Sequence, residues 1–343
     1  MTAPRRILVV MLRRIGDVVL TTPAVRALRA LYPDATIDFL TEPPCHEILG
    51  GAHEISNILV YRKGWFNYLY WFWRLRSRRY DWAIDYMGNP RSAMLTFLTR
   101  APLRAGPARV SHAWAYTHRL QQPAETLYNP LEKIRMLRGL GISPDESDPM
   151  PKLAASAEAE EFAQKALVRM RMPKAPLVGL IPASRRETRR WPAPSYAALG
   201  RLLRDRKGVN LLVCWGPGER ELAERVRDGI GEQAYLSPET ADLRQASAVL
   251  GRCDIIVTNC NGPRHLAGAR GVPTLTIHSS SDPASWNPPD AERFPFVRRD
   301  GLHCIACRKN KCPYDLECLR ELAPERVFEE AAALLDRTRR SAA

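Results

Sequence analysis

The sequence predicts two α/β domains, each built on a parallel β-sheet with helices on both faces. Short β-branched apolar runs alternate with helical patterns along most of the chain, which is typical of this class. A stretch rich in Pro, Asp and Ser at 143–157 interrupts that alternation. The length of 343 residues suits two domains of ordinary size, for which we expect the ranges 1–150 and 151–343.

In the first domain, strands are expected where short apolar runs lie between polar segments. A loop, Arg13–Asp17, follows the first run. The segment 21–23 (Thr-Thr-Pro) then supplies the capping residues and the early proline of a helix that continues to Leu31. The expected strands are Ile7–Met11, Thr36–Leu40, Ile58–Tyr61 and Trp82–Tyr86.

The same rhythm restarts in the second domain. Its expected strands are Leu177–Ile181, Asn210–Trp215, Asp254–Thr258 and Thr274–His278. Helical patterns lie between and after them, at Tyr196–Asp205, Glu219–Gly229, Arg264–Ala269 and Pro324–Thr338. Because open parallel sheets bind ligands at the carboxyl ends of their strands, residues directly after each strand are the first candidates for a site.

Net positive charge is the unusual feature of the composition. The chain has 51 Lys and Arg against 37 Asp and Glu, a net charge of +14, which favours anionic partners such as nucleic acid, anionic lipid or phosphorylated ligands. No apolar run reaches the ~18–20 residues of a membrane span, and Ile7–Leu12 is too short for a signal-peptide core. We therefore expect a cytoplasmic protein, whose eight cysteines are reduced or bound to metal.

Asp17 follows the first strand in a Gly-Asp pair, with Arg13 and Arg14 beside it. A carboxylate at that place can accept a proton from a substrate hydroxyl as a general base, and the two arginines can bind an anionic group. Simpler interpretations stay open, because Asp is a common helix cap and charge runs are usually solvated.

An arginine-rich segment follows the first strand of the second domain. From Ser184 to Trp191 it reads SRRETRRW, and its hydroxyl and guanidinium groups suit phosphate oxygens. Further along, Glu219 ends a Gly-Pro-Gly-Glu motif that suits a ribose hydroxyl, since glycine lets a ligand approach the backbone. An ordinary basic loop and a plain tight turn explain these two segments equally well.

The segment Thr258–His265 (TNCNGPRH) lies at another expected strand end. Backbone N–H groups at the start of the following helix can receive a diphosphate, although His265 can equally be an ordinary polar residue of the first turn. The chain lacks the G-x-G-x-x-G, G-x-x-x-x-G-K and G-x-S-x-G motifs, which argues against a dehydrogenase, a P-loop NTPase and an α/β-hydrolase.

In their order, these motifs resemble the lipopolysaccharide heptosyltransferases of glycosyltransferase family 9. The resemblance rests on ILVVMLRRIGDVVLTTPAVRALRALYPDATIDFLT, YDWAIDYMGNPRSAMLTFL, GLIPASRRETRRWP, WGPGERE, VTNCNGPRHLAGARGVPTLTIH and a cysteine tail before APERV, which span nearly the whole chain. It implies a GT-B fold, with two Rossmann-like domains facing a central cleft. It also implies an inverting, metal-independent transfer of heptose from ADP-heptose to the inner core of lipid-anchored lipopolysaccharide, with no cofactor required for catalysis.

The resemblance implies a role for each candidate residue. Asp17 takes the position of the catalytic carboxylate, Arg13 and Arg14 lie where the first domain binds the acceptor, and Glu219 stands at the ribose position of the second, nucleotide-sugar-binding domain. Arg189 replaces the usual lysine, and a cation there would stabilise the charge on the departing ADP. The residues placed at the donor diphosphate are Ser184, Arg185, Arg189, Gly262, Pro263 and His265.

One position departs from the family pattern. The family commonly reads Asp-Ser/Thr-Gly where this chain has Cys260, Asn261 and Gly262. In the family the Asp contacts the donor sugar or supports the turn, and a thiol cannot act as a carboxylate. The alternative to heptose transfer is therefore a relative that uses a different nucleotide-sugar donor, or one that binds the donor without turnover.

Residues 65–82 combine nine aromatic residues with four arginines. Such a segment can form an amphipathic helix that lies on a membrane surface, where basic residues gain from anionic lipid. A helix packed on the first sheet, with its arginines in water, is the alternative. With a lipid-anchored acceptor, the membrane interpretation predicts a peripheral protein on the inner face of the cytoplasmic membrane.

Four cysteines lie close together near the C-terminus. Cys304, Cys307, Cys312 and Cys318 have the spacing C-x2-C-x4-C-x5-C, which suits a structural zinc ion with all four ligands filled. An iron–sulfur cluster is an alternative, and a cysteine-rich tail inherited without metal is another.

The basic charge of the chain also suggests a rival function, that of a nucleic-acid-binding protein. The sequence contains no recognised nucleic-acid-binding module, so we expect no such partner.

Overall fold

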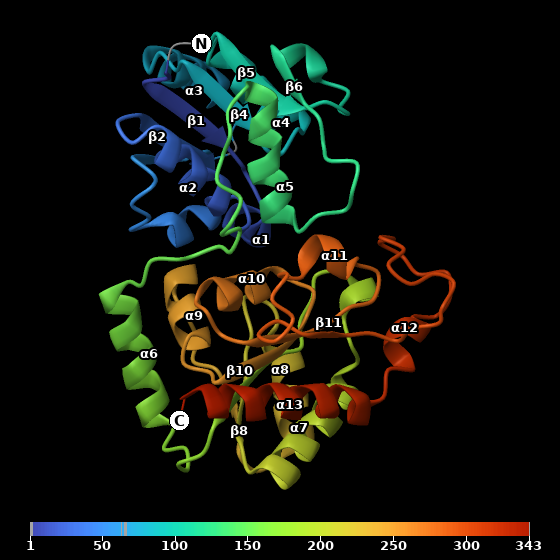
Figure 1. The fold of residues 1–343 in the computed structure, drawn as a ribbon. Coiled ribbons are helices and arrows are strands. Elements are labelled where there is room, and N and C mark those ends of the chain that lie inside the picture. Colours follow the sequence, from blue (N-terminus) through green and yellow to red (C-terminus); the bar gives the residue numbers. More distant parts are fainter. Residues whose placement is uncertain (1–2, 63, 65–66, 343) are drawn as a thin grey trace. The chain divides into compact units, whose positions relative to one another are not determined.

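The computed structural model describes residues 3–62, 64 and 67–342, and the chain divides into two compact units, Met1–Ala154 and Ala155–Ala343. The first unit is built on a six-stranded sheet in the order β3-β2-β1-β4-β5-β6, with all neighbours parallel (Figure 1). Its strands are β1 (Arg6–Val10), β2 (Thr36–Thr41), β3 (Asn57–Val60), β4 (Trp82–Asp85), β5 (Leu103–Pro107) and β6 (His118–Leu120).

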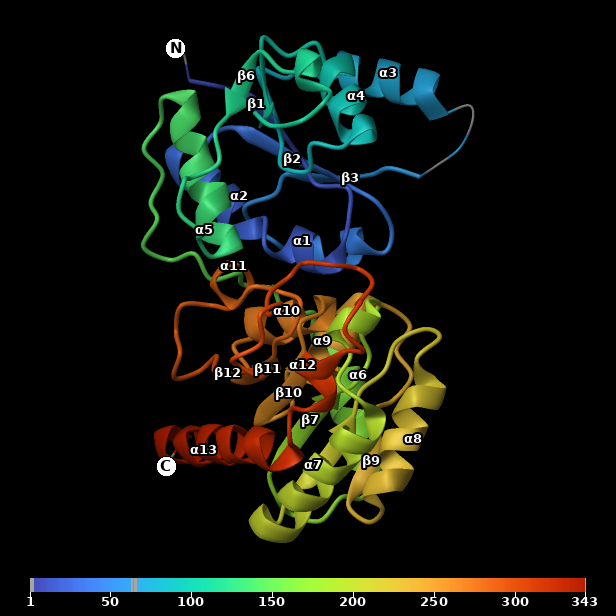
Figure 2. The same ribbon diagram turned by 90° about the vertical axis from the view of Figure 1, so that its right-hand side faces the viewer.

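Helices cover both faces of the first sheet. The α-helices of this unit are α1 (Ile15–Val19), α2 (Thr22–Leu31), α3 (Asn67–Ser77), α4 (Pro90–Leu98) and α5 (Asn129–Met136), and short 3-10 turns lie at Cys45–Leu49, Ala113–Ala115 and Leu137–Leu140. Helix α2 packs beside α5, and α3 packs beside α4 (Figure 2). On the α3 side, Trp71 and Leu75 are buried against Leu8 and Val10 of the central strand.

The second unit repeats this design. Its parallel strands are β7 (Leu177–Ile181), β8 (Asn210–Val213), β9 (Ala234–Leu236), β10 (Ile255–Asn259), β11 (Thr274–Ile277) and β12 (Phe296–Val297), in the order β12-β11-β10-β7-β8-β9. Read from the other edge, this is the same pattern as in the first unit. The order reverses at β1/β4 in one sheet and at β7/β10 in the other, and such switch points are where doubly wound sheets bind ligands.

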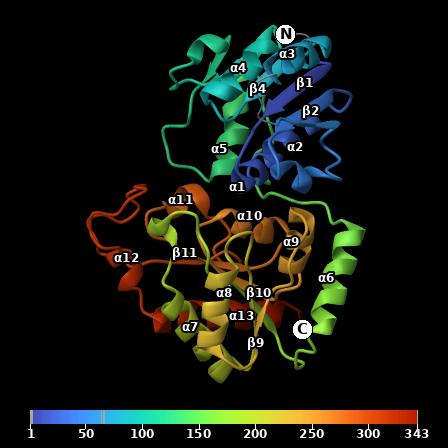
Figure 3. The same cartoon turned by 180° about the vertical axis from the view of Figure 1, so that it is seen from behind.

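Helices also cover both faces of the second sheet. They are α6 (Ala157–Arg169), α7 (Ala193–Lys207), α8 (Arg220–Ile230), α9 (Leu243–Leu250), α10 (Gly262–Ala269), α11 (Pro283–Trp286), α12 (Glu317–Arg320) and α13 (Pro324–Ala342), with a 3-10 turn at Glu187–Arg189. Residues of α7, α8 and α13 share one core with the sheet, while α6 lies beside α9 (Figure 3). Within that core the indole of Trp191 packs against Tyr196 and donates to the Leu322 carbonyl at 3.2 Å.

The expected strands and helices are present, with ends shifted by a few residues, and the structure adds elements that the pattern did not predict. The expected loop at 13–17 is wrong in part, because Ile15–Val19 forms the short helix α1. Strand β5 contains Gly106 and Pro107, and β12 has only two residues, so neither carries a readable apolar run. Among the described helices, none is both long enough and apolar enough to cross a membrane.

Candidate functional site

Asp17 lies directly after the central strand of the first sheet, in the first turn of α1. Its carboxylate Oδ2 accepts a hydrogen bond from the backbone N–H of Arg14 at 3.1 Å. Asp17 therefore does cap the start of α1, as the simpler interpretation predicted. The same bond fixes the direction of the carboxylate, and capping with one oxygen is compatible with proton transfer. Asp17 is half-buried, whereas Arg13 and Arg14 are exposed beside it.

Three other groups surround Asp17. The hydroxyl of Thr21 donates to the Asp17 carbonyl at 2.7 Å, and the Lys133 ammonium of α5 lies 3.4 Å from that oxygen. Burial raises the pKa of the Cys45 thiol to about 12, and the neighbouring charge of Asp17 adds to that shift. The sequence pattern gave no signal for Lys133, because it stands more than 100 residues away in an unremarked segment.

The arginine-rich segment lies at the carboxyl end of β7, as its position after a strand predicted. Ser184 is buried, and its carbonyl accepts two hydrogen bonds from the Arg190 guanidinium, at 2.6 and 3.0 Å. Arg185 is exposed and Arg189 half-buried. The segment is therefore folded back on itself and is more ordered than an extended, solvated charge run.

Two asparagines at the end of β10 fasten this segment to the neighbouring strand. Asn259 accepts the Trp191 N–H at 3.0 Å and donates to the Pro182 carbonyl at 2.8 Å. Asn261 donates to the Ala183 carbonyl at 2.8 Å and caps α10 by accepting the Arg264 N–H at 3.1 Å. The ends of β7 and β10 thus form one connected surface at the switch point of the second sheet.

Gly262, Pro263 and His265 lie in the first turn of α10, next to that surface. The His265 side chain is buried, and its ring lies 6.3 Å from the Trp286 ring. Beside it, the buried Arg264 guanidinium donates to Thr276 at 3.2 Å and to Asn287 at 2.9 Å. The structure therefore brings together the two donor-site segments that are about 75 residues apart in the sequence.

Positive charge gathers at this place. Burial lowers the pKa of His278 to about 3, and the Arg264 and Arg189 guanidinium groups add to that shift. His278 directly follows β11, so a third strand end contributes to the same surface. Arg264 and His278 also lie at this place, and the sequence analysis did not single out either as a site candidate. Their position after or near strand ends was a usable signal, but neither stood out by residue type.

Cys260 is buried, and its Sγ lies 4.0 Å from Nη1 of Arg189. The position that departs from the family pattern therefore contacts the cation that replaces the usual lysine. Glu219 stands at the end of the Gly-rich turn after β8, where its Oε2 accepts the Gly216 N–H at 3.1 Å. Burial raises the pKa of the Glu219 carboxyl.

The cysteine tail is joined to the arginine-rich segment by hydrogen bonds. The Thr188 hydroxyl donates to the Lys309 carbonyl at 2.9 Å, and Ser279 donates to the Thr188 carbonyl at 2.7 Å. The N–H groups of Ala306 and Arg308 donate to the carbonyls of Ser279 and Ser280, at 2.9 and 2.7 Å. The tail thus forms a strap across the ends of β7 and β11.

The other three thiols of that tail affect the titration of Cys318. Burial raises the pKa of Cys318 to about 11, and the charges of Cys312, Cys304 and Cys307 add to the shift. All four are free half-buried cysteines. In the part of the chain that the structure describes, however, no three His, Cys, Asp or Glu side chains are grouped closely enough to hold a metal ion.

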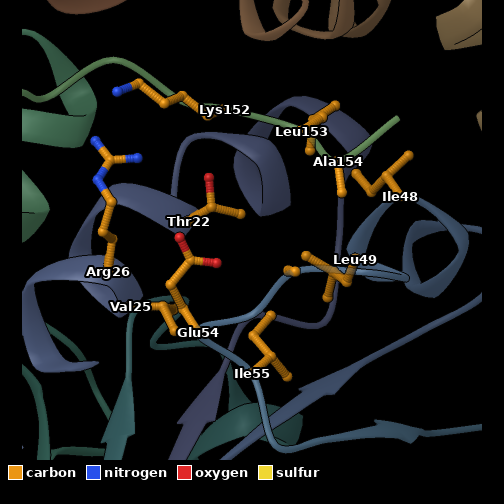
Figure 4. A pocket seen from close by; sticks show the side chains of 11 residues that line it. Thr22, Val25, Arg26, Ile48, Leu49, Glu54, Ile55, Lys152, Leu153 and Ala154 are labelled. Atoms are coloured by element: carbon orange, nitrogen blue, oxygen red, sulfur yellow. The ribbon is translucent and has the colours of Figure 1, made fainter. Parts of the chain in front are cut away.

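A small surface pocket in the first unit lies apart from all predicted site residues (Figure 4). It is bounded by α2 and by residues 152–154, with Arg26 and Glu54 at its rim. Arg26 donates to the Asp148 and Met150 carbonyls at 2.6 and 3.0 Å. These bonds fasten residues 148–150, near the end of the first unit, to α2. We propose no ligand for the pocket.

Comparison with known proteins places this geometry in a family. The chain is 26% identical to lipopolysaccharide heptosyltransferase 2 of Escherichia coli K12, over 96% of this chain and 98% of that protein. Its fold matches a glycosyltransferase family 9 protein from Veillonella parvula, with a TM-score of 0.83 at 22% identity and coverage of 96% and 97%. It also matches E. coli ADP-heptose lipopolysaccharide heptosyltransferase II, with a TM-score of 0.76 at 22% identity and coverage of 97% and 99%.

A more distant solved structure shares the fold as well. It is an iron-containing dodecameric glycosyltransferase from enterotoxigenic E. coli, with a TM-score of 0.60 at 14% identity, covering all of this chain and 78% of that one. These matches confirm the expected GT-B class of two Rossmann-like domains. The model of glycosyltransferase family 9 (heptosyltransferase) matches residues 70–318, and the chain is therefore a glycosyltransferase that belongs to that family.

Proposed function

We propose that this chain transfers heptose from ADP-heptose to the inner core of lipid-anchored lipopolysaccharide, with inversion at the anomeric carbon. The first unit binds the acceptor and the second binds the nucleotide sugar. The observation that carries the proposal is that each sheet has its candidate residues at its own switch point: Asp17 after β1, and the arginine-rich segment with the start of α10 after β7 and β10.

The donor diphosphate is proposed to lie against Ser184, Arg185, Arg189 and the turn Gly262–His265. Guanidinium groups and a helix N-terminus both favour phosphate oxygens. The pKa of His278, which nearby guanidinium groups help to lower, supports a positive potential there. As the bond from heptose C1 to the diphosphate oxygen breaks, negative charge grows on ADP, and positioned cations stabilise it. Glu219, at the next strand end, is proposed to bind the ribose hydroxyls.

Asp17 is proposed to take the proton from the acceptor hydroxyl as its oxygen attacks C1. The bond to the Arg14 N–H fixes the carboxylate before substrate arrives, which lowers the cost of reaching a reactive geometry. Arg13 and Arg14 are exposed beside it and suit the acidic sugars of the acceptor. A relative that binds nucleotide sugar without turnover is the alternative, motivated by the buried thiol of Cys260 in place of a carboxylate.

Replacing Asp17 by Asn tests both the reaction and the base. Asn keeps an oxygen for the Arg14 N–H but cannot accept a proton, so turnover should fall by roughly 10²–10⁴-fold while ADP binding stays unchanged. The assay incubates protein with ADP-heptose and a lipopolysaccharide precursor that carries only the first acidic sugars, and counts added heptose by mass spectrometry.

Asp205→Asn is the control for this experiment, because Asp205 is an exposed carboxylate paired with Arg204 in the second unit. Undiminished turnover in Asp17→Asn would show that another group is the base. Bound ADP with no heptose added by the wild-type protein would favour a different donor or the non-catalytic alternative.

We further propose that α3 contacts the inner leaflet of the cytoplasmic membrane. Leu69 and Trp73 are 68% and 64% exposed, and Tyr70 is exposed beside them. Other residues of the segment cannot contact a membrane. The ring of Trp71 is buried, with its centroid 5.6 Å from that of Tyr61, and Nη1 of Arg78 pairs with Oδ2 of the buried Asp38 at 2.6 Å. Trp65 and Phe66, which belong to the same aromatic segment, lie outside the described residues.

Further exposed apolar residues lie on α4, which packs beside α3, and on the turn next to α4. Phe97 at the end of α4 and Trp114 in the next 3-10 turn are both exposed, with rings 5.2 Å apart. Arg76 and Arg79 are exposed near the end of α3. Aromatic and aliphatic side chains with arginines nearby are what an anionic membrane interface binds. The proposed location is therefore cytoplasmic and peripheral, and the proposal includes no nucleic-acid partner.

The double variant Leu69→Ser/Trp73→Ser should bind vesicles of anionic phospholipid roughly tenfold or more weakly, because it removes two apolar side chains from the interface. Co-sedimentation at a fixed lipid concentration measures this. Val168→Ser is the matched control, since Val168 is 64% exposed on α6 in the other unit. Equal binding of the double variant and the wild type would eliminate the membrane proposal.

We also propose that the cysteine tail holds one structural zinc ion, bound by Cys304, Cys307, Cys312 and Cys318. Their shared segment and the effect of three thiols on the pKa of the fourth support it, although the thiols must draw closer than they lie here to ligate a metal. The iron-containing relative makes iron the alternative. Because the strap contacts Thr188, the metal would stabilise the donor segment and take no part in the reaction.

Protein purified without chelator should contain about one equivalent of zinc if all four thiols are ligands. The variant Cys307→Ser/Cys312→Ser should lose it, while Cys253→Ala, which changes a buried thiol outside the tail, should keep it. Elemental analysis for zinc and iron in the same samples distinguishes the two metals. A content near zero for both would show that the cysteines are inherited without a metal.

A further inference from the structure

Lys133 is a buried cation with no role in the reaction as proposed above. Its side chain is 5% exposed and lies on α5, beneath the turn that carries Asp17. Its Nζ donates to Asn129 Oδ1 at 2.6 Å and lies 3.4 Å from the Asp17 carbonyl oxygen. Both partners are neutral acceptors, so these contacts do not neutralise the ammonium.

Burying a charge among neutral groups is costly, and the titration of Lys133 reflects that cost. Burial lowers its pKa to about 8, against the opposing effects of Asp17 and Glu132, which favour the charged form. At neutral pH the side chain is therefore still an ammonium ion. Between about pH 8 and the usual lysine value of ~10.4, the unfolded chain binds more protons than the folded one, so this group makes the fold more stable as pH rises.

Two carboxylates act on the pKa of Lys133. Asp17 acts on it from α1 and Glu132 from α5 itself. The helix α2 and the turn Leu137–Leu140 also pack against α5. Their arginines have other partners: Arg26 pairs with Asp148 at 3.3 Å, Arg138 pairs with Glu146 at 2.8 Å, and Arg29 binds the Glu54 carbonyl at 3.1 Å. Among the described groups named here, Asp17 is the one from another element that acts on the pKa of Lys133.

We propose that Lys133 is a positioning residue for Asp17: the Lys133 ammonium holds the backbone carbonyl of Asp17 and supplies positive charge near its carboxylate. Together with the Thr21 hydroxyl, it fixes the carbonyl end of Asp17, while the Arg14 N–H fixes the carboxylate end. A charge-assisted hydrogen bond holds such a geometry more strongly than a neutral one. This inference rests on the proposed role of Asp17 as the base.

The experiment measures kcat and KM for ADP-heptose against pH in wild type, Lys133→Met and Lys133→Arg, with the melting temperature of each. Lys133→Met should lower kcat by roughly 10–100-fold, as expected for a misplaced base, with donor KM unchanged. Its melting temperature at pH 7 should not fall, because Met removes a buried charge and fills a similar volume. Lys165→Met is the control, since Lys165 is exposed on α6.

The pH profile separates positioning by charge from packing alone. Wild-type kcat should decline above about pH 8 as the ammonium deprotonates. That limb should be absent in Lys133→Met and displaced to higher pH in Lys133→Arg, because guanidinium stays charged there. A Lys133→Met variant that is destabilised at pH 7, or whose profile merely lies below and parallel to wild type, would overturn the proposal.

Failure of this inference is distinguishable from failure of the proposed function. If Asp17→Asn keeps full turnover, the base assignment fails whatever Lys133 does. If Asp17→Asn is inactive and Lys133→Met is fully active with an unchanged pH profile of kcat, Asp17 remains the proposed base and the positioning role of Lys133 is refuted. The melting temperatures need no substrate, so a lower value for Lys133→Met at pH 7 contradicts the inference even if no heptose is transferred.

Discussion

Parallel pairing of buried strands is the constraint on which the rest of this structure depends. In a parallel sheet every strand ends at the same edge, so each loop that follows a strand is delivered to one place. In the first unit this brings the turn of Asp17 out beside the end of β4, and in the second it joins segments that follow β7 and β10. The apolar strands themselves carry no chemistry, and they leave the loops free to carry it.

In the second unit, a few asparagine side chains convert this common edge into a defined surface. Asn259 and Asn261 each bond to the backbone of the loop after β7, so the arginine-rich segment and the start of α10 cannot move independently without breaking buried hydrogen bonds. Thr188 extends the network to the cysteine strap. Cys260 lies within this framework, between Asn259 and Asn261, and Asn261 caps α10.

Much of the fold was predictable because its central strands are short β-branched runs, such as Ile7–Val10 and Leu177–Ile181, whose burial on both faces leaves a clear pattern. The edge strands were not, since β6 has three residues and is partly exposed, and β12 has two. Asp17 and the segment from Ser184 were found because they follow strong strands. Lys133 and Arg264 were not, because their importance comes from burial beside distant residues, which a local pattern does not contain.

We propose that the edge formed by the ends of β7 and β10 holds the donor nucleotide. The most direct measurement is a crystal structure of the full chain with ADP. We expect the diphosphate to lie against Arg189 and the first turn of α10, with the ribose within hydrogen-bonding distance of Glu219. Well-ordered ADP bound elsewhere, with Arg189 and His265 making no contact to it, would show that this edge is not the donor site.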